Sequence, residues 1–133
     1  MSKRMTKGEF QESLGALDPV DHAILAFEND SVAGDAAKAL RDGGFGEADV
    51  LSYTSSELFP NLNEMMRTAS GAAGFGYQVT LMRRYMTLAS EGCGWLVVYA
   101  PGDAERDKVQ AVARKFNARS AVRYGRLASE DLI

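Results

Sequence analysis

The chain has 133 residues, of which 46% are hydrophobic and 25% are charged. Such a length and composition are typical of one soluble globular domain whose core forms without disulfides or metal. The formal net charge of −3 argues against broad binding to nucleic acid, and the single cysteine excludes an intrachain disulfide and a cysteine-rich zinc site.

No segment of the sequence predicts a membrane location. The longest strongly apolar run, WLVVYA at 95–100, is far too short to span a bilayer. Residues 1–20 are polar and lack the apolar centre of a signal peptide. We therefore expect a cytoplasmic protein with no membrane or nucleic-acid partner and with no cofactor.

Residues 1–20 predict an N-terminal arm or short helix. Phe10, Leu14 and Leu17 are spaced by four and then three residues, which places them in one apolar stripe of a helix. Pro19 ends this helix, because the residue before a proline is driven out of the helical conformation. An arm that docks on the body or on a partner subunit and a frayed tail remain alternatives.

The first part of the domain expected at 21–133 predicts a strand, a helix and a second strand. The strand is HAILAFEN at 22–29, and the helix covers 32–42 with Asp30 or Ser31 as its N-terminal cap. Two glycines follow this helix and end it, since glycine tolerates the left-handed conformation found after a last turn. The second strand is DVLSYT at 49–54.

Residues 56–91 form a helical insert in the predicted fold. Pro60 suits the first turn of one helix, and an apolar stripe over 81–88 marks another. The segment between them, ASGAAGFGY at 69–77, contains three glycines. A phosphate-binding loop needs such glycines directly after a strand, whereas a helix precedes them here. The sequence therefore favours a helical hairpin with a glycine turn.

The remaining residues predict a third strand, a helix and a fourth strand. GWLVVYAP at 94–101 is the most apolar of the strands, and SAVRYG at 120–125 is the last. The helix between them begins after a cap at Asp103 and carries a regular apolar stripe that ends at Phe116.

The number of helices in the insert decides the topology. One helix from Pro60 to Glu91 would be about 48 Å long, roughly twice the length of the predicted strands. Two antiparallel helices return the chain to the end that it left, so the third strand runs antiparallel to the second. We therefore predict an α+β, ferredoxin-like split βαβ fold with a four-stranded antiparallel sheet and a helical hairpin between strands two and three. A doubly wound parallel sheet is the alternative.

A short signature surrounds the end of the first predicted helix. Leu40, Gly44-Phe45 and Asp49-Val50 resemble a motif of bacterial general-stress-protein-like domains, which are small ferredoxin-like modules of unknown activity. The likeness covers 22–54 and 94–132. It implies the same fold and a stress-linked accessory role, and it carries over no catalytic residue.

The insert departs from some members of that family. Those relatives carry a membrane-inserting glycine zipper between the two halves of the fold. The insert of this chain is predicted to be soluble, because its residues 62–91 include the charged residues Glu64, Arg67, Arg83, Arg84 and Glu91.

Cys93 and His22 are the obvious candidates for a nucleophile and its base. In the antiparallel topology they lie at opposite ends of the sheet, about 20 Å apart at ~3.3 Å per residue. We therefore predict no catalytic residue, with Cys93 as a small, partly buried filler and His22 as a surface residue at the strand end. A metal site needs several ligands, and one histidine with one cysteine supplies only two.

The candidate ligand-binding residues gather around the last strand. Glu28 is an acid inside an otherwise apolar strand, so it either pairs with Arg119 or Arg123 or orients a ligand. Arginine matches the geometry of phosphate, which makes a small anion or nucleotide the expected ligand. Solvated surface arginines are the alternative interpretation. The candidates are Glu28, Arg83, Arg84, Arg123, Tyr124 and Arg126.

The predicted strands are apolar on both faces, so the second face of the sheet needs a cover. The inserted helices or a second subunit can supply it, and we expect a homodimer or larger homo-oligomer. The leading hypothesis is a non-catalytic regulatory or accessory module that acts by self-association and partner contact. A module that binds a small anionic ligand comes second. A small dimeric α+β-barrel enzyme comes third, with only Glu28, Tyr99 and Tyr124 as acid–base candidates.

Overall fold

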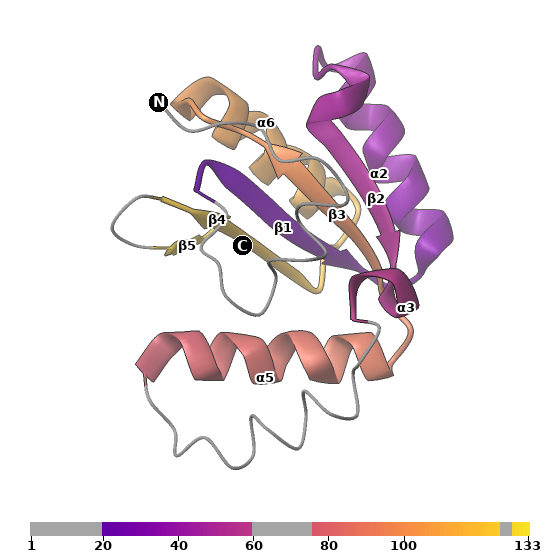
Figure 1. The fold of residues 1–133 in the computed structure, drawn as a ribbon. Coiled ribbons are helices and arrows are strands. Elements are labelled where there is room, and N and C mark those ends of the chain that lie inside the picture. The colour runs from indigo at the N-terminus through magenta and orange to yellow at the C-terminus, as the bar shows by residue number, and fades with distance from the viewer. Residues whose placement is uncertain (1–19, 60–75, 126–128) are drawn as a thin grey trace.

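The computed structural model describes residues 20–59, 76–125 and 129–133 (Figure 1). Its elements follow one another in this order: β1 (His22–Phe27), α2 (Asp30–Asp42), the 3-10 helix η1 (Glu47–Asp49), β2 (Val50–Thr54), α3 (Ser55–Leu58), α5 (Gly76–Ser90), β3 (Gly94–Tyr99), α6 (Asp103–Lys115), β4 (Ser120–Tyr124) and β5 (Ser129–Asp131).

The strands form one antiparallel sheet in the order β2-β3-β1-β4-β5. The α+β class and the antiparallel relation of β2 to β3 are therefore confirmed. The prediction of four strands was wrong, because Ser129–Asp131 pairs with β4 as a fifth strand. These three residues are too few to show the alternation of apolar and polar residues that reveals a strand in a sequence.

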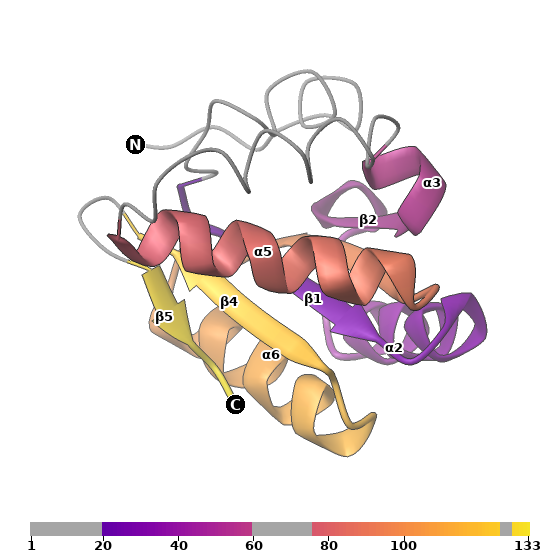
Figure 2. The same ribbon diagram turned by 90° about the horizontal axis from the view of Figure 1, so that it is seen from below.

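The sheet lies between two helical layers. Helices α2 and α6 cover one face, and α5 lies on the other (Figure 2). Successive side chains of a strand point to opposite faces, so β1 contributes to both layers. The first core contains Leu25, Phe27, Leu40, Leu96 and Val109, among others. The second contains Ile24, Leu58, Tyr85, Leu88 and Trp95, among others.

The second face of the sheet is thus covered from within the chain, by α3 and α5. A second subunit is not needed to cover it. The first helix of the predicted hairpin, the glycines at 71 and 74 and the N-terminal arm at 1–19 lie outside the described residues. Gly76, which was predicted to belong to the glycine turn, is the first described residue of α5.

Helix α2 begins earlier than predicted. Its N-cap is Asn29, whose Oδ1 accepts a hydrogen bond from the Val32 amide at 2.9 Å, and not Asp30 or Ser31. Strand β1 ends at Phe27, two residues before this cap, and leaves Glu28 outside the sheet. Helix α6 is also preceded by a different cap, Gly102 instead of Asp103, and this glycine supplies no side-chain bond.

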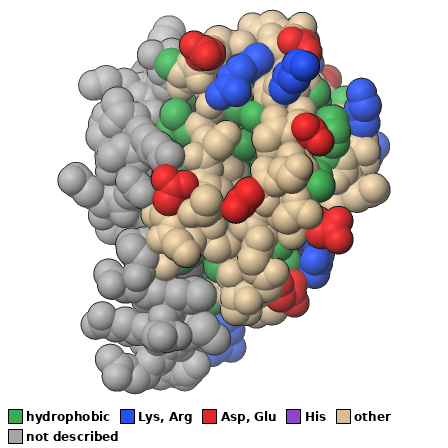
Figure 3. Space-filling view, turned by 90° about the vertical axis from the view of Figure 1, so that its right-hand side faces the viewer, with side chains coloured by type: hydrophobic (Ala, Val, Ile, Leu, Met, Phe, Trp, Pro, Cys, Tyr) green, Lys and Arg blue, Asp and Glu red, His purple; other side chains and the backbone are tan. Residues whose placement is uncertain are grey.

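The described surface carries few large apolar groups. Ile133, 51% exposed, is the one exposed large hydrophobic residue among the described positions. Seen from the side of α2 and β2, acidic and basic side chains are interspersed with small hydrophobic patches (Figure 3). Within the described ranges, no helix is both long and apolar enough to cross a membrane.

Candidate functional site

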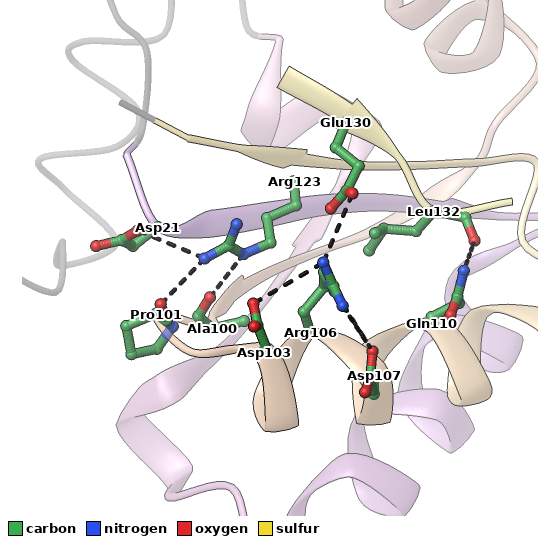
Figure 4. A network of polar contacts seen from close by, with 10 residues as sticks. All are labelled: Asp21, Ala100, Pro101, Asp103, Arg106, Asp107, Gln110, Arg123, Glu130 and Leu132. Carbon is green, nitrogen blue, oxygen red and sulfur yellow. Dashed lines mark hydrogen bonds and ion pairs between the residues drawn. The ribbon is translucent and has the colours of Figure 1, made fainter. Parts of the chain in front are cut away.

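Arg123 of β4 belongs to a polar network between the sheet and α6 (Figure 4). Its Nε and Nη2 atoms donate to the carbonyl oxygens of Ala100 and Pro101 at 2.9 and 3.0 Å. Its guanidinium also lies 3.6 Å from the carboxylate of Asp21. The side chain therefore fastens the turn between β3 and α6 to the start of β1.

Arg106 extends this network to the fifth strand. Its guanidinium lies 3.2 Å from Asp107, 3.9 Å from Asp103 and 3.7 Å from Glu130 of β5. Beside it, Gln110 donates to the carbonyl oxygen of Leu132 at 2.8 Å. The network thus holds β5 and the chain end against α6.

Tyr124 points to the opposite side of the sheet from Arg123, as adjacent residues of a strand must. It is 5% exposed, and its hydroxyl lies 2.8 Å from the hydroxyl of Tyr85 on α5. This buried hydroxyl pair connects the last long strand to the helix that covers the second core.

The two arginines of α5 lie apart from Arg123. Arg84 forms an ion pair with Asp131 of β5 at 3.4 Å, on the α5 side of the sheet, and Arg83 is exposed. Both partners of the ion pair are substantially exposed, so this pair stabilises the fold by less than about 1 kcal/mol.

The remaining ligand candidates do not complete a cluster. Glu28 is exposed beyond the end of β1, so its predicted place inside that strand was wrong. The predicted partner Arg119 pairs with Glu91 at 2.9 Å instead. Arg126 lies outside the described residues. The structure therefore distributes the candidates over both sides of the sheet and does not bring them to one point.

His22 is buried, contrary to the prediction of a surface residue. It is 1% exposed, its Nδ1 lies 2.9 Å from the carbonyl oxygen of Val20, and its ring packs against Tyr99 at 5.1 Å between centroids. Burial lowers the pKa of this imidazole. The prediction missed the position of β1 in the middle of the sheet, where the His22 ring packs beside Tyr99, its partner residue on β3.

Cys93 is also 1% exposed, in agreement with its prediction as a filler. Burial raises the pKa of its thiol, which disfavours the reactive thiolate. The β1–β3 register pairs His22 with Tyr99 and Phe27 with Gly94. Cys93 and His22 therefore lie at opposite ends of this ladder, too far apart for a hydrogen bond.

An aromatic cluster around Trp95 was missed by sequence reasoning. The indole Nε1 donates to Ser55 Oγ at 2.9 Å, and Ser55 Oγ donates to the Cys93 carbonyl oxygen at 2.7 Å. Phe59 and Tyr85 meet the indole edge to face at 5.2 and 5.4 Å. The cluster anchors α3 and α5 on β3.

A sequence signal for part of this anchor does exist. The segment TSSE at 54–57 has the form of a capping box, in which a threonine and a glutamate three residues later bond each other's backbone amides. In the structure Glu57 accepts from the Thr54 amide at 2.9 Å, and Thr54 Oγ1 accepts from the Glu57 amide at 3.1 Å. This box fixes the turn that delivers Ser55 to Trp95.

Contacts with other parts of the fold engage the side chains of Trp95, Arg106, Arg123 and Tyr124. Across the described part of the chain, no group of three or more histidine, cysteine, aspartate or glutamate residues is placed to hold a metal ion. Burial also raises the pKa of the Tyr53 hydroxyl, which keeps that hydroxyl neutral.

Comparison of the chain with protein-family models, with curated proteins and with solved structures found no match in any of the three.

Proposed function

We propose that the protein is a non-catalytic accessory module that acts through contact with itself or with a partner protein. The observation that carries this proposal is the placement of its two most reactive side chains. Cys93 and His22 are each 1% exposed, and they lie at opposite ends of the β1–β3 ladder. A nucleophile needs access to a substrate and a base within hydrogen-bond reach, and this placement gives Cys93 neither.

The interactions of the arginines within the fold support a function in protein–protein contact rather than in anion binding. Arg106, Arg119 and Arg123 hold elements of the fold together through carboxylates and backbone carbonyls. An anion would have to compete with these partners. It would also find the α5 arginines on the other side of the sheet from Arg123.

The fold that we propose is ferredoxin-like. The halves β1-α2-β2 and β3-α6-β4 each contain two strands joined by a helix, and their strands interleave in the order β2-β3-β1-β4. In this interpretation β5 is an addition at one edge and α5 belongs to the insert. The resemblance to general-stress-protein-like domains adds a stress-linked role, which a rise of the protein's abundance after heat or oxidative challenge would support.

Static light scattering across a wide concentration range tests the proposal. We expect a mass above that of one chain. Because helices cover both faces of the sheet, we expect the contact to use outer helix surfaces. Asp35→Lys on α2 and Arg114→Glu on α6 reverse exposed charges on two such surfaces. A monomer at every concentration, with no partner recovered by crosslinking in cells, would count against the proposal.

A further inference from the structure

The outer side of β2 is one of the two edges of the sheet. Other groups of the chain form hydrogen bonds with the first residue of this strand, Val50, and with its last residue, Thr54. The Val50 amide donates to the Glu47 carbonyl oxygen, and the Val50 carbonyl oxygen accepts from Arg41 Nη2 at 3.0 Å. At the other end, the Thr54 amide donates to Glu57 Oε1 at 2.9 Å.

These bonds fix which residues of β2 face outward. Residues of an antiparallel ladder alternate between positions that bond the neighbouring strand and positions that do not. Since Val50 and Thr54 bond groups outside β3, the intervening residues Leu51 and Tyr53 bond β3, and Ser52 faces outward. Among the described residues, the amide and carbonyl of Ser52 are thus the remaining open pair on this edge.

The sequence of β2 offers no other protection against edge pairing. VLSYT contains neither a charged residue nor a proline, which are the usual means of blocking an edge strand. At the opposite end of the sheet, β5 is only three residues long and carries Glu130 and Asp131. The edge at risk is therefore that of β2.

A second copy of this chain is the occupant that fits the β2 edge. If two β2 strands met antiparallel about a two-fold axis at Ser52, Leu51 of each copy would lie opposite Tyr53 of the other. These side chains point to the same face of the sheet and would form apolar cross-strand pairs, with no like charges opposed.

We propose that Arg41 and Glu57 close the β2 edge and so prevent two copies of the chain from joining their sheets. With both side chains in place, an incoming strand finds one open residue and two occupied ends. Without them, it also finds the Val50 carbonyl oxygen and the Thr54 amide open, and in the two-fold arrangement these two groups face each other across the copies. This inference goes beyond the proposed function, because it directs any working contact away from the sheet edge.

The double variant Arg41→Ala/Glu57→Ala tests the inference by light scattering. We expect its mass to be twice that of the wild-type protein at the same concentration, whatever the wild-type mass is. Adding Ser52→Lys to the double variant should restore the wild-type mass, since a charge at the centre of the strand blocks pairing. Glu57→Gln retains an acceptor for the Thr54 amide and should stay at the wild-type mass.

The matched control is Lys38→Ala/Glu47→Ala, which removes one exposed charge of each sign from the same region without opening the edge. A doubled mass for this control would show that the loss of surface charge alone causes association, and it would overturn the inference. So would a double variant that has wild-type circular dichroism and Trp95 fluorescence but keeps the wild-type mass.

If the double variant does not fold, the single variants take its place. Arg41→Ala and Glu57→Ala should each bind a labelled peptide of residues 49–55 at least about tenfold more tightly than the wild type, measured by fluorescence anisotropy. Equal binding by the wild type and both single variants would overturn the inference.

Discussion

Gly94→Ala probes a close backbone approach at the start of β3. A Cβ atom at this position would lie 2.6 Å from the carbonyl oxygen of Asn29 and 2.7 Å from the Cα of Asp30. Both atoms belong to the backbone, so no flexible side chain can yield. The N-terminus of α2 would have to move away from β3, and we expect unfolding to become easier by about 2–3 kcal/mol, as for an overpacked core.

Gly34→Ala is the matched control for this substitution. Gly34 lies in the interior of α2, and a Cβ atom there would meet nothing within 4 Å. Alanine restricts the unfolded chain more than glycine and favours the helix, so we expect stabilisation by about 0.5–1 kcal/mol. The same chemical change should therefore have opposite effects at the two positions.

Urea unfolding measures both effects in one assay. Trp95 is the single tryptophan and is fully buried, so its fluorescence reports the loss of the core on the α5 side. The two variants should differ by about 3 kcal/mol in free energy of unfolding, or roughly 10 °C in Tm for a chain of this size. A Gly94→Ala protein within about 0.5 kcal/mol of the wild type would refute the reasoning from backbone contact.

Three further substitutions test single side chains. Burial lowers the pKa of His22 in the folded protein from 6.5, so the contribution of the neutral imidazole to stability is complete above pH 6.5 and decreases as the pH falls below that value. His22→Gln should remove this part of the pH dependence of the free energy of unfolding, which urea titrations at several pH values measure. Ser55→Ala leaves the Trp95 indole without its acceptor and should cost about 1–3 kcal/mol, whereas Ser56→Ala in the same turn should change stability by less than about 0.5 kcal/mol. Ser120→Ala removes a buried hydroxyl for which the described part of the chain supplies no hydrogen-bond partner, so thermal unfolding should show no loss or a gain of up to about 1 kcal/mol. A clear loss of stability would mean that the hydroxyl is satisfied.

Periodicity predicted the strands β1 to β4 and the helices α2, α5 and α6, because these segments bury regular faces. The antiparallel sheet followed from an argument about chain direction. The burial of His22 did not follow from any local pattern, since it depends on β1 lying between β3 and β4. Strand β5 was missed for a related reason: its stability comes from β4 and from the Arg106 and Gln110 contacts of α6, not from its own composition.

Two of the candidate ligand residues, Arg123 and Tyr124, lie on opposite sides of the sheet in the structure. Arg123 and Tyr124 were both assigned to a basic end of the last strand, but adjacent residues of a strand point to opposite faces of the sheet. The same rule places Tyr124 with α5 and Arg123 with α6. Their partners, Tyr85 and the carbonyls after β3, could not be predicted, because they depend on how each helix is positioned over the sheet.

The two side chains that close the β2 edge, Arg41 and Glu57, also differ in whether their contacts can be predicted from the sequence. Glu57 is local: it stands three residues after Thr54, and the capping-box spacing alone places its carboxylate on the Thr54 amide. Arg41 is nine residues from Val50, and its bond exists only because α2 packs beside β2. A variant that displaces α2, such as Gly94→Ala, should therefore weaken the hydrogen bond from Arg41 to the Val50 carbonyl and leave the hydrogen bond from the Thr54 amide to Glu57 intact. If the edge inference is correct, Gly94→Ala should bind the 49–55 peptide more tightly than Gly34→Ala does, under conditions where both are folded.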